Sequence, residues 1–532
     1  MNALKEILKQ FLLVLVSHFT NKKSRYSYPK MNMIIFTSIA TPLLLIIITL
    51  SSFILKTFIG KSIKSPKYPP VIGTVFGQLL YFNKLHDYFT EIAHKHPTFR
   101  LLAPDQSELY TTDARNIEHI LRTNFDNYSK GENNKDIVTD LFGNGIFAVD
   151  GVKWKQQRKL ASFEFSTRVL RDFSCKVFRK NATKLVRVVS DFAKVNRDFD
   201  VQNLLMQCTL ESIFKVGFGV DLNCLEGSSE EGSAFIKAFD DSNALIYWRY
   251  VDPFWKLKRY LNIGCEASLR NNIKLINDFV LNLISKKRKQ LGTNQHSNEK
   301  EDILSRFLIE SKKDPMMNDQ YLMDIILNFL IAGKDTSANT LSWFFYMLCK
   351  NPLVQEKIVL EIEKLAGSQE NAATIEDFVD KITDEVLEKM HYLHAALSET
   401  LRLYPAVPLD GRVADMDDNL PDGFKLKKGD SVYYISYAMG RMPYIWGDDA
   451  EDFKPERWLN DNVSNMAILQ GGPRICLGKD FAYRQMKIMS IAVLRFFMFK
   501  LADESRKVTY RTMFTLHIEG GLHLLAVART SL

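Results

Sequence analysis

The sequence predicts one large, mainly α-helical domain behind an amino-terminal membrane helix, with only small β-sheets at its periphery. Three observations support this prediction. Residues 33–55 are uncharged throughout, most long segments after residue 71 repeat apolar residues with helical spacing, and strand-like runs such as 431–436 and 522–527 are short. With 46 % hydrophobic and 25 % charged residues, the 532-residue chain can bury a large core.

The uncharged run 33–55 predicts a transmembrane anchor. As a helix it would be about 34 Å long, enough to cross a hydrocarbon core of about 30 Å. Lysines that follow the run favour a cytosolic position for the large domain: Lys56, Lys61, Lys64 and Lys67. Basic residues also precede it, and they oppose this orientation unless translation begins at Met31: Lys22, Lys23, Arg25 and Lys30.

We therefore divide the chain into four parts: an extension without an assigned role (1–32), the anchor (33–55), a basic, proline-containing hinge (56–70) and the large domain (71–532). The polar stretch 286–301 is predicted to be a solvated loop within the large domain rather than a boundary.

Charge and cysteine content narrow the classes of function. The formal net charge of +8 is too small and diffuse to indicate nucleic-acid binding, but it suits a membrane surface or an acidic protein partner. The six cysteines are scattered without a CxxC pair, which argues against a zinc site or a disulfide framework. Residues 143–148 match the fingerprint GxGxxA, but no helical pattern opens directly after them, so no dinucleotide site is predicted.

Cys476 lies in a glycine-rich loop, QGGPRICLGKDFA (470–482). Gly472 and Gly478 leave room for the backbone to approach a flat cofactor. The run 481–494 predicts a helix, whose amino-terminal dipole would favour a thiolate at Cys476. Arg474 can pair with an anionic group of the cofactor. This pattern predicts a cysteine ligand to haem iron, whereas the other five cysteines are expected to be small buried hydrophobes.

Glu399 and Arg402 share one face of a helix predicted over residues 385–403, and Arg457 follows in the run PERW (455–458). Such a pair is usually solvated and contributes little to stability. One glutamate with two arginines could instead lock this helix against the loop that precedes the cysteine.

Residues 332–337, AGKDTS, lie within a helix predicted over residues 318–350 that Asn351-Pro352 ends. Gly333 permits a local widening of this helix. Oxygen activation needs a hydroxyl to steady bound dioxygen and a carboxylate to relay protons, which Thr336 and Asp335 can supply. In the alternative interpretation Thr336 bonds back to a helix carbonyl and Asp335 is solvated.

Trp154 and Arg158 stand four residues apart, so that an indole N–H and a guanidinium can reach one anionic propionate. The alternative for this segment is an ordinary amphipathic helix.

Taken together and in their order along the chain, the four motifs resemble the cytochrome P450 superfamily, and the resemblance extends from about residue 65 to the end of the chain. The resemblance implies a single triangular helical domain with small peripheral sheets, which binds haem b and makes 71–532 the catalytic domain. It implies that Cys476 is the axial ligand and that Asp335 and Thr336 serve oxygen activation. It assigns a structural triad to Glu399, Arg402 and Arg457. The candidate propionate partners are Trp154, Arg158, Arg412 and Arg474.

A narrower resemblance is to plant fatty-acid ω-hydroxylases, through residues 249–256, 479–487 and 515–521. It implies anchoring in the endoplasmic reticulum and hydroxylation of a long acyl chain, with substrate contacts near Val407, Pro408, Leu409, Thr515 and Leu516. The chain carries no recognisable reductase domain, so electrons are expected from an NADPH–cytochrome P450 reductase. A basic surface could bind that acidic flavoprotein: Lys153, Lys155, Lys159, Lys479, Arg484 and Lys487.

Leu469 departs from this branch, because the family usually carries phenylalanine seven residues before the cysteine, and the stretch 461–469 is short. The departure leaves open a haem-poor relic or a non-enzymatic binding protein. A haem-thiolate isomerase or dehydratase that needs neither dioxygen nor a reductase is a further alternative, against which the Asp335–Thr336 pair argues.

Overall fold

The computed structural model describes residues 44–529, apart from residues 46, 60, 105–106, 167, 227–229, 294–301, 313–316, 368–373 and 460–470. The chain forms two compact units, residues 1–60 and residues 61–532. Among the described residues, no helix combines the length and the apolar character that crossing a membrane requires. Residues 33–43 and 46 of the predicted anchor lie outside the described part, as does the extension 1–32, so the anchor stays a prediction.

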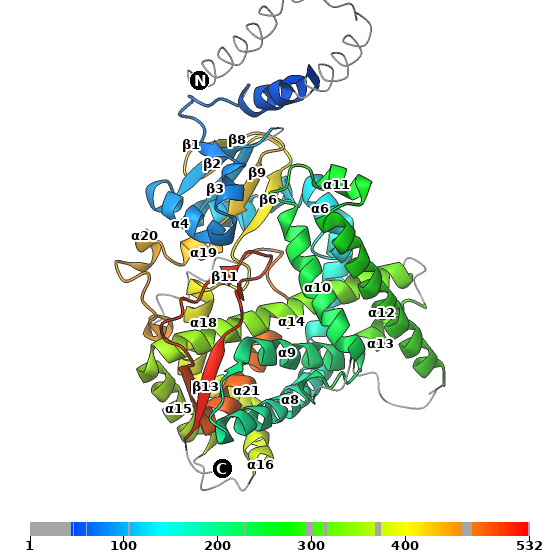
Figure 1. Ribbon diagram of the computed structural model, residues 1–532, viewed down its shortest axis with the longest axis vertical. Helices are drawn as coiled ribbons and strands as arrows, with labels where there is room; N and C mark the ends of the chain where they lie inside the picture. Colours follow the sequence, from blue (N-terminus) through cyan, green and yellow to red (C-terminus); the bar gives the residue numbers. More distant parts are fainter. Residues whose placement is uncertain are drawn as a thin grey trace, which may run out of the picture. The chain divides into compact units, whose positions relative to one another are not determined.

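The second unit is mainly helical, and in Figure 1 the largest sheet lies at one end of it while most of the long helices lie away from that sheet. The longer helices are α4 (Leu85–Lys95), α6 (Glu132–Phe142), α7 (Gly151–Ser166), α8 (Arg168–Lys194), α9 (Val201–Phe218), α10 (Glu230–Trp248), α12 (Cys265–Thr293), α14 (Asp319–Lys350), α15 (Pro352–Ala366), α18 (His391–Leu403) and α21 (Lys479–Phe496). The shorter ones are α3 (Gly77–Leu80), α5 (Ala114–Glu118), α11 (Trp255–Leu261), α13 (Ile303–Glu310), α16 (Ile375–Asp380), α17 (Asp384–Lys389), α19 (Ser436–Met439) and α20 (Pro443–Trp446).

Four small sheets accompany these helices in the described part of the chain. The largest has the strand order β1-β2-β3-β9-β6-β4, with β1 (Val71–Thr74), β2 (Thr98–Leu102), β3 (Ser107–Thr111), β9 (Ser431–Tyr434), β6 (Asp410–Ala414) and β4 (Tyr128–Ser129). The others are β10 (Phe497–Leu501) with β13 (His523–Ala528) and β5 (Phe199–Asp200), β11 (Tyr510–Arg511) with β12 (His517–Ile518), and β7 (Asp418–Asn419) with β8 (Lys425–Leu426). The predicted mainly α domain with small sheets is therefore confirmed.

Local signals in the sequence set the ends of the central helix α14. The side chain of Asn318 accepts a hydrogen bond from the backbone N–H of Tyr321, which caps the first turn. The helix ends at Asn351, where Pro352 begins α15. The predicted helix over residues 318–350 is thus confirmed to within one residue. It is α-helical along its whole length, so this helix does not use the local widening that Gly333 permits.

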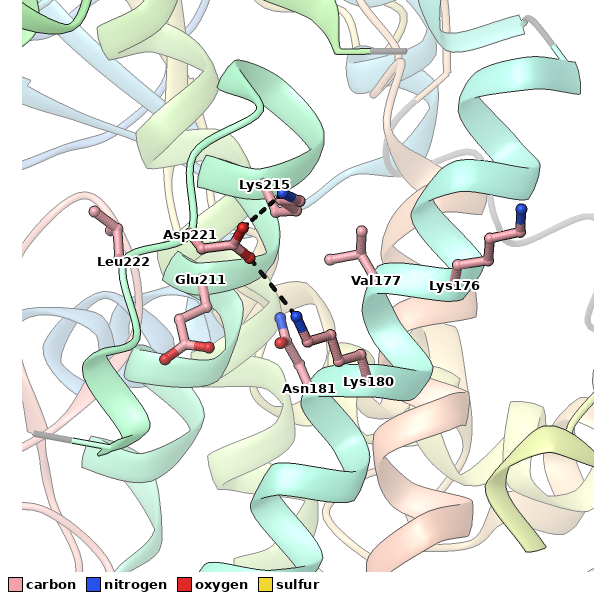
Figure 2. A pocket seen from close by; sticks show the side chains of 8 residues that line it. All are labelled: Lys176, Val177, Lys180, Asn181, Glu211, Lys215, Asp221 and Leu222. Atoms are coloured by element: carbon pink, nitrogen blue, oxygen red, sulfur yellow. Dashed lines mark hydrogen bonds and ion pairs between the residues drawn. The ribbon is translucent and has the colours of Figure 1, made fainter. Parts of the chain in front are cut away.

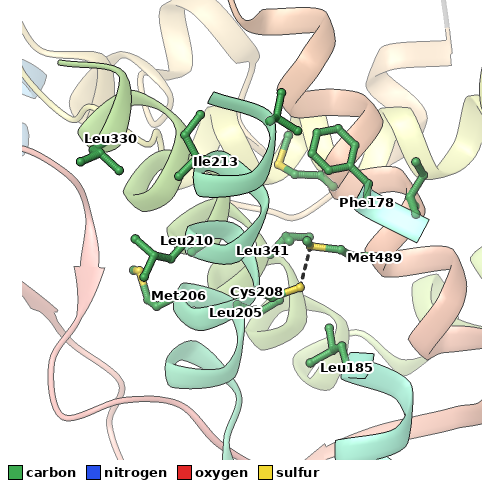
Figure 3. Packing of buried hydrophobic residues seen from close by; sticks show 14 of the residues in the cluster. Phe178, Leu185, Leu205, Met206, Cys208, Leu210, Ile213, Leu330, Leu341 and Met489 are labelled. Atoms are coloured by element: carbon green, nitrogen blue, oxygen red, sulfur yellow. Dashed lines mark hydrogen bonds between the residues drawn. The ribbon is translucent and has the colours of Figure 1, made fainter. Parts of the chain in front are cut away.

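Helices α9, α14 and α21 form the centre of the core. A Cβ on Gly333 of α14 would lie 2.7 Å from Ile213 of α9, so glycine permits the close approach of these two helices. Figure 3 shows Cys208 of α9 directed toward Met489 of α21, with the two sulfur atoms 4.0 Å apart. Cys208 is therefore a buried core residue, as predicted from the sequence.

Two other expectations need correction. The helix predicted over residues 385–403 consists of α17 and α18, separated at Met390. The stretch 286–301, predicted as a loop, is helical up to Thr293, because α12 continues that far. The GxGxxA match at residues 143–148 also has a structural explanation. A Cβ on Gly143 or Gly145 would collide with side chains of α14, so these glycines allow close packing.

Candidate functional site

The loop that carries Cys476 leads directly into α21. Cys476 lies two residues before Gly478, the N-cap of the helix. All six cysteines belong to the described part of the chain, and Cys476 is the exposed one, whereas the other five are buried or half-buried. Gly472 has a positive φ of 88°, and a Cβ there would lie 1.9 Å from the carbonyl oxygen of Leu121, so only glycine fits. Gly478 has no comparably close protein neighbour.

The surroundings of Cys476 act on the pKa of its thiol in two opposite directions. The protein around the sulfur raises the pKa of the Cys476 thiol by desolvation, whereas the Gly478 amide, which hydrogen-bonds the sulfur, lowers it together with Arg158 and Lys479. An amide donor and two nearby cations stabilise a thiolate, and the thiolate is the form of cysteine that binds a metal ion. The guanidinium of Arg158 also donates to the carbonyl of Ile475, which ties α7 to the cysteine loop.

A second group of cations comes from three places: Arg412 lies on β6, Lys130 directly follows β4, and Arg474 lies in the cysteine loop. Arg412 donates to Asp410 at 3.3 Å, and Arg474 contacts Asp150 at 2.5 Å. Lys130 pairs with Asp410 at 2.6 Å. Burial and the charge of Arg412 lower the pKa of Lys130 to about 8 and that of Arg474 to about 10. Three cations thus face two carboxylates.

This cationic group fits an anionic cofactor. Its three cations against two carboxylates leave one positive charge in excess, and the Nε atoms of Arg412 and Arg474 are buried without a hydrogen-bond partner among the described residues. Buried donors of this kind are normally satisfied. The carboxylates of haem propionates would satisfy them, and the excess positive charge favours binding of such an anion.

The predicted propionate partners differ in their geometry. Trp154 is buried, and its ring lies under the guanidinium of Arg474, 4.4 Å from the ring centroid. Arg412, Arg474 and Trp154 therefore gather around one region, while Arg158 lies beside the cysteine. Lys130 was not predicted, and no signal in the sequence distinguishes it from the many surface lysines.

Glu399, Arg402 and Arg457 also lie together. Arg402 donates two hydrogen bonds of 2.7 Å to Glu399, and the Nε of Arg457 lies 3.3 Å from the same carboxylate. The indole of Trp458 and the backbone N–H of Lys454 donate to Glu399 at 2.8 and 2.9 Å. The pair Glu399–Arg402 is fully buried, so the solvated alternative does not apply.

On α14 the structure combines both interpretations of the Asp335–Thr336 pair. The hydroxyl of Thr336 donates to the carbonyl of Ala332 at 2.5 Å, as the alternative predicted. Asp335 is buried rather than solvated. Its two carboxylate oxygens contact Lys334 at 2.6 Å and the amide of Asn243 at 3.0 Å.

The two stretches predicted to contact substrate meet in space. The backbone N–H of Leu516 donates to the carbonyl of Ala406 at 3.1 Å, next to the run Val407, Pro408 and Leu409. Val407 is exposed, Pro408 is buried and Leu409 is half-buried. Leu516 is fully buried, and its carbonyl accepts a hydrogen bond of 2.8 Å from Trp343 of α14. The buried hydroxyl of Thr515 has no hydrogen-bond partner among the described residues.

The expected basic surface is smaller than predicted. Lys487 is buried and donates to the carbonyl of Leu387 at 2.7 Å. Arg484 pairs with Asp384 at 2.6 Å. These two cations already have partners within the fold, whereas the others are exposed: Lys153, Lys155, Lys159 and Lys479.

The segment 249–256 has a structural role in the fold. Arg249 is buried and donates two hydrogen bonds, of 2.8 and 2.6 Å, to Glu266 of α12. A third bond of 2.7 Å reaches Asp140 of α6. Lys256 pairs with Asp136 of α6 at 3.0 Å on the surface. The segment therefore joins α6 to α12.

A small surface pocket lies elsewhere, between α8 and the end of α9 (Figure 2). Lys215 and Lys180 both approach Asp221 there, at 2.6 and 3.9 Å. None of the residues predicted for the site lines this pocket. Leu469 and the stretch 461–469 lie outside the described residues.

Comparison with known proteins identifies the family. The family model described as Cytochrome P450 matches residues 65–525. Cytochrome P450 704C1 of Pinus taeda is 50 % identical over 484 residues, which cover 88 % of this chain and 93 % of that protein. Cytochrome P450 704B1 of Arabidopsis thaliana is 42 % identical over 499 residues, 87 % and 95 % of the two chains. Cytochrome P450 86B1 of the same plant is 39 % identical over 448 residues, 81 % and 80 %. Together with the exposed cysteine ahead of α21 and the cationic group near it, these matches show that the chain belongs to the cytochrome P450 family of haem-thiolate monooxygenases.

Proposed function

We propose that this monooxygenase hydroxylates the terminal region of long-chain fatty acids, with Cys476 as the axial ligand of haem b. The observation that carries the haem assignment is the exposed Cys476 thiol at the start of α21, close to Arg158 and hydrogen-bonded by the Gly478 amide. Arg412, Arg474 and Trp154 would hold the propionates, with Lys130 as a further cation. When bound, the haem supplies activation of dioxygen for insertion into a C–H bond.

Asp335 and Thr336 would serve this chemistry from α14. The Thr336 hydroxyl, which now donates to the Ala332 carbonyl, would donate a hydrogen bond into the site after a rotation about its side-chain bond. Contacts with Lys334 and Asn243 hold the Asp335 carboxylate in place, and from that position it would relay protons.

The substrate class rests on the resemblance to plant fatty-acid ω-hydroxylases and on the apolar side chains of Val407, Pro408, Leu409 and Leu516, next to Thr515, where the two substrate stretches meet. An unactivated terminal methyl group carries no polar handle, so an apolar channel must orient it. Electrons would come from NADPH through a flavoprotein reductase that docks on the exposed lysines Lys155, Lys159 and Lys479. Residues 33–55 would anchor the enzyme in the endoplasmic reticulum membrane, with the catalytic domain in the cytosol.

The carbon-monoxide difference spectrum of the reduced, membrane-expressed protein tests the haem assignment. We expect a red-shifted Soret band that is lost in Cys476→Ser. Cys265→Ser is the matched control, because Cys265 is also partly exposed at the start of a helix and should leave the band unchanged. A wild-type protein that expresses without this band would favour the haem-poor relic.

A second measurement tests the reaction class and the substrate. Purified enzyme with reductase and NADPH should convert long-chain fatty acids to ω-hydroxy acids, and omission of NADPH should abolish turnover. Turnover of hydroperoxides without NADPH would instead favour the isomerase alternative. Val407→Phe, which enlarges an exposed side chain at the meeting point of the two substrate stretches, should move oxidation along the acyl chain if this segment contacts substrate.

A further inference from the structure

One lysine of α14 is enclosed between carboxylates from two helices. Lys334 is only 1 % exposed. Its Nζ lies 2.5 Å from a carboxylate oxygen of Asp240 on α10 and 2.6 Å from one of Asp335. The side chain of Asp240 is 30 % exposed, whereas that of Asp335 is 2 % exposed. The three groups therefore form a continuous contact that begins at solvent and ends inside the protein.

The charge balance of this group is unusual for a buried site. Two carboxylates share one ammonium, which leaves one negative charge in excess, and an unbalanced buried charge is costly. Burial and the charge of Asp335 raise the pKa of Asp240 to about 6, although Lys334 opposes this shift. The two acids raise the pKa of Lys334 itself. Asp240 is therefore the member that changes its charge near neutral pH, while Lys334 stays protonated.

We infer that Asp240 is the solvent-side end of a proton path that supplies Asp335, with Lys334 as the bridge between the two carboxylates. The inference rests on the proposed function, in which Asp335 relays protons. Because an ammonium group has no lone pair, Lys334 first passes a proton to Asp335 and then, as an amine, accepts the proton of protonated Asp240. Lys334 is again an ammonium with three protons, one proton has moved inward, and solvent protonates Asp240 again. Asp240 acts through Asp335 and is a positioning residue rather than a catalytic one.

Among the described residues, the groups named beside this path are an acid, a neutral histidine and an amide. The acid next to Asp240 in sequence, Asp241, adds to the repulsion that raises the pKa of Asp240. His517 of β12 faces Lys334 and Asp335, but burial lowers its pKa to about 4, so it is neutral at physiological pH. The amide of Asn243, on the same helix as Asp240, holds the second oxygen of Asp335 at 3.0 Å and fixes the orientation of that carboxylate.

The test compares Asp240→Asn with Asp241→Asn in the membrane-bound holoenzyme with its reductase. Asn at 240 keeps the size of the side chain but cannot carry a proton, whereas Asp241→Asn removes the same charge one residue away. The readouts are product formed per NADPH, hydrogen peroxide released, and the ratio of rates in H2O and D2O, each from pH 5.5 to 8. We expect Asp240→Asn to lower product per NADPH several-fold, to divert oxygen to peroxide, and to enlarge the solvent isotope effect.

The pH profile separates proton supply from a structural role. In the wild type, product per NADPH should decrease as pH rises through about 6, because Asp240 then loses its proton. This decrease should be absent in Asp240→Asn, present again in Asp240→Glu, and retained in Asp241→Asn. A normal carbon-monoxide band with an unchanged profile and isotope effect in Asp240→Asn would overturn the inference while leaving the proposed function intact.

A readout that needs no turnover completes the test. Infrared difference spectra between pH 5 and pH 7 should show the C=O stretch of a protonated carboxyl that disappears in Asp240→Asn and persists in Asp241→Asn. Its presence in Asp240→Asn would show that another acid titrates there and would overturn the assignment. A wild-type protein that lacks the carbon-monoxide band would overturn the proposed function and this inference together.

Discussion

Two buried ion clusters of the catalytic domain differ in their charge balance. Around Glu399, one carboxylate is held by the guanidinium groups of Arg402 and Arg457. Around Lys334, one ammonium is shared by the carboxylates of Asp240 and Asp335. Arg457 also pairs with Asp449 at 2.7 Å, so the charges of the first cluster are balanced, whereas the second cluster has one acid in excess.

This difference decides what each cluster can do. Arginine does not lose its proton in proteins, and both oxygens of Glu399 are already filled by donors, including the indole of Trp458. The remaining guanidinium N–H groups of Arg402 donate to backbone carbonyls, for example that of Ala450 at 2.5 Å. That cluster is a fixed tie between α18 and the segment before the cysteine loop. The Lys334 cluster holds an acid that is short of cations and can therefore take up and release a proton.

Removal of the tie at Arg402 should have the largest effect. Arg402→Leu leaves the buried Glu399 with reduced compensation, and breaking such a pair costs about 3–5 kcal/mol. We expect most of the expressed protein to lose the carbon-monoxide band and to unfold at a lower denaturant concentration. Lys389→Ala is the control, since the exposed pair Glu385–Lys389 is screened by solvent and its loss should change stability little. A stable, fully haem-loaded Arg402→Leu protein would contradict the structural role.

Lys334→Met should come next, and unlike Arg402→Leu its effect should depend on pH. Without the ammonium, Asp240 and Asp335 repel each other when both are ionised. We expect a loss of about 3 kcal/mol at pH 8, of the size measured for broken buried pairs, and a smaller loss at pH 5, where an acid can be protonated. The measurement is the free energy of unfolding at both values of pH. Lys334→Arg should recover most of the loss, and a loss that is equal at both values of pH would remove the distinction between the two clusters.

Asp240→Asn should change how the free energy of unfolding varies with pH, and not only its value at one pH. The pKa of Asp240 is about 6 in the folded protein, against an ordinary value of 3.8. Between these values the folded state binds more protons than the unfolded state, so the contribution of Asp240 to wild-type stability declines as pH rises. Relative to Asp240→Asn, the wild type should therefore be more stable at pH 4.5 than at pH 7. Parallel stability curves for the two proteins would show that Asp240 does not titrate there.

The smallest effect is expected at an exposed pair on the same domain. Lys256 and Asp136 are 62 % and 54 % exposed, and their nitrogen and oxygen atoms are 3.0 Å apart. Lys256→Ala should lower the free energy of unfolding by less than about 1 kcal/mol, and high salt should remove the difference. Arg249→Met in the same segment breaks a buried bidentate contact with Glu266 and should cost several times more. Equal losses in the two variants would mean that burial does not set the scale of these ion pairs.

The sequence by itself determined the helices and the chemical groups of the site. Helical periodicity, the cap at Asn318 and the stop at Pro352 are local signals, and they placed Asp335 and Thr336 on α14. The glycine-rich loop likewise singled out Cys476 before the fold was known. These predictions need only neighbours within a few residues.

Only the tertiary structure decided which charged groups meet. Asp240 is 94 residues from Lys334, and Asp410 is 280 residues from Lys130, so no local pattern marks these pairs. Packing also showed that Lys487, which was predicted to bind a reductase, is buried. The physical reason is that a side chain's charge is visible in the sequence, whereas its burial and its partner depend on how distant helices and strands pack, and these two properties set its pKa and its role.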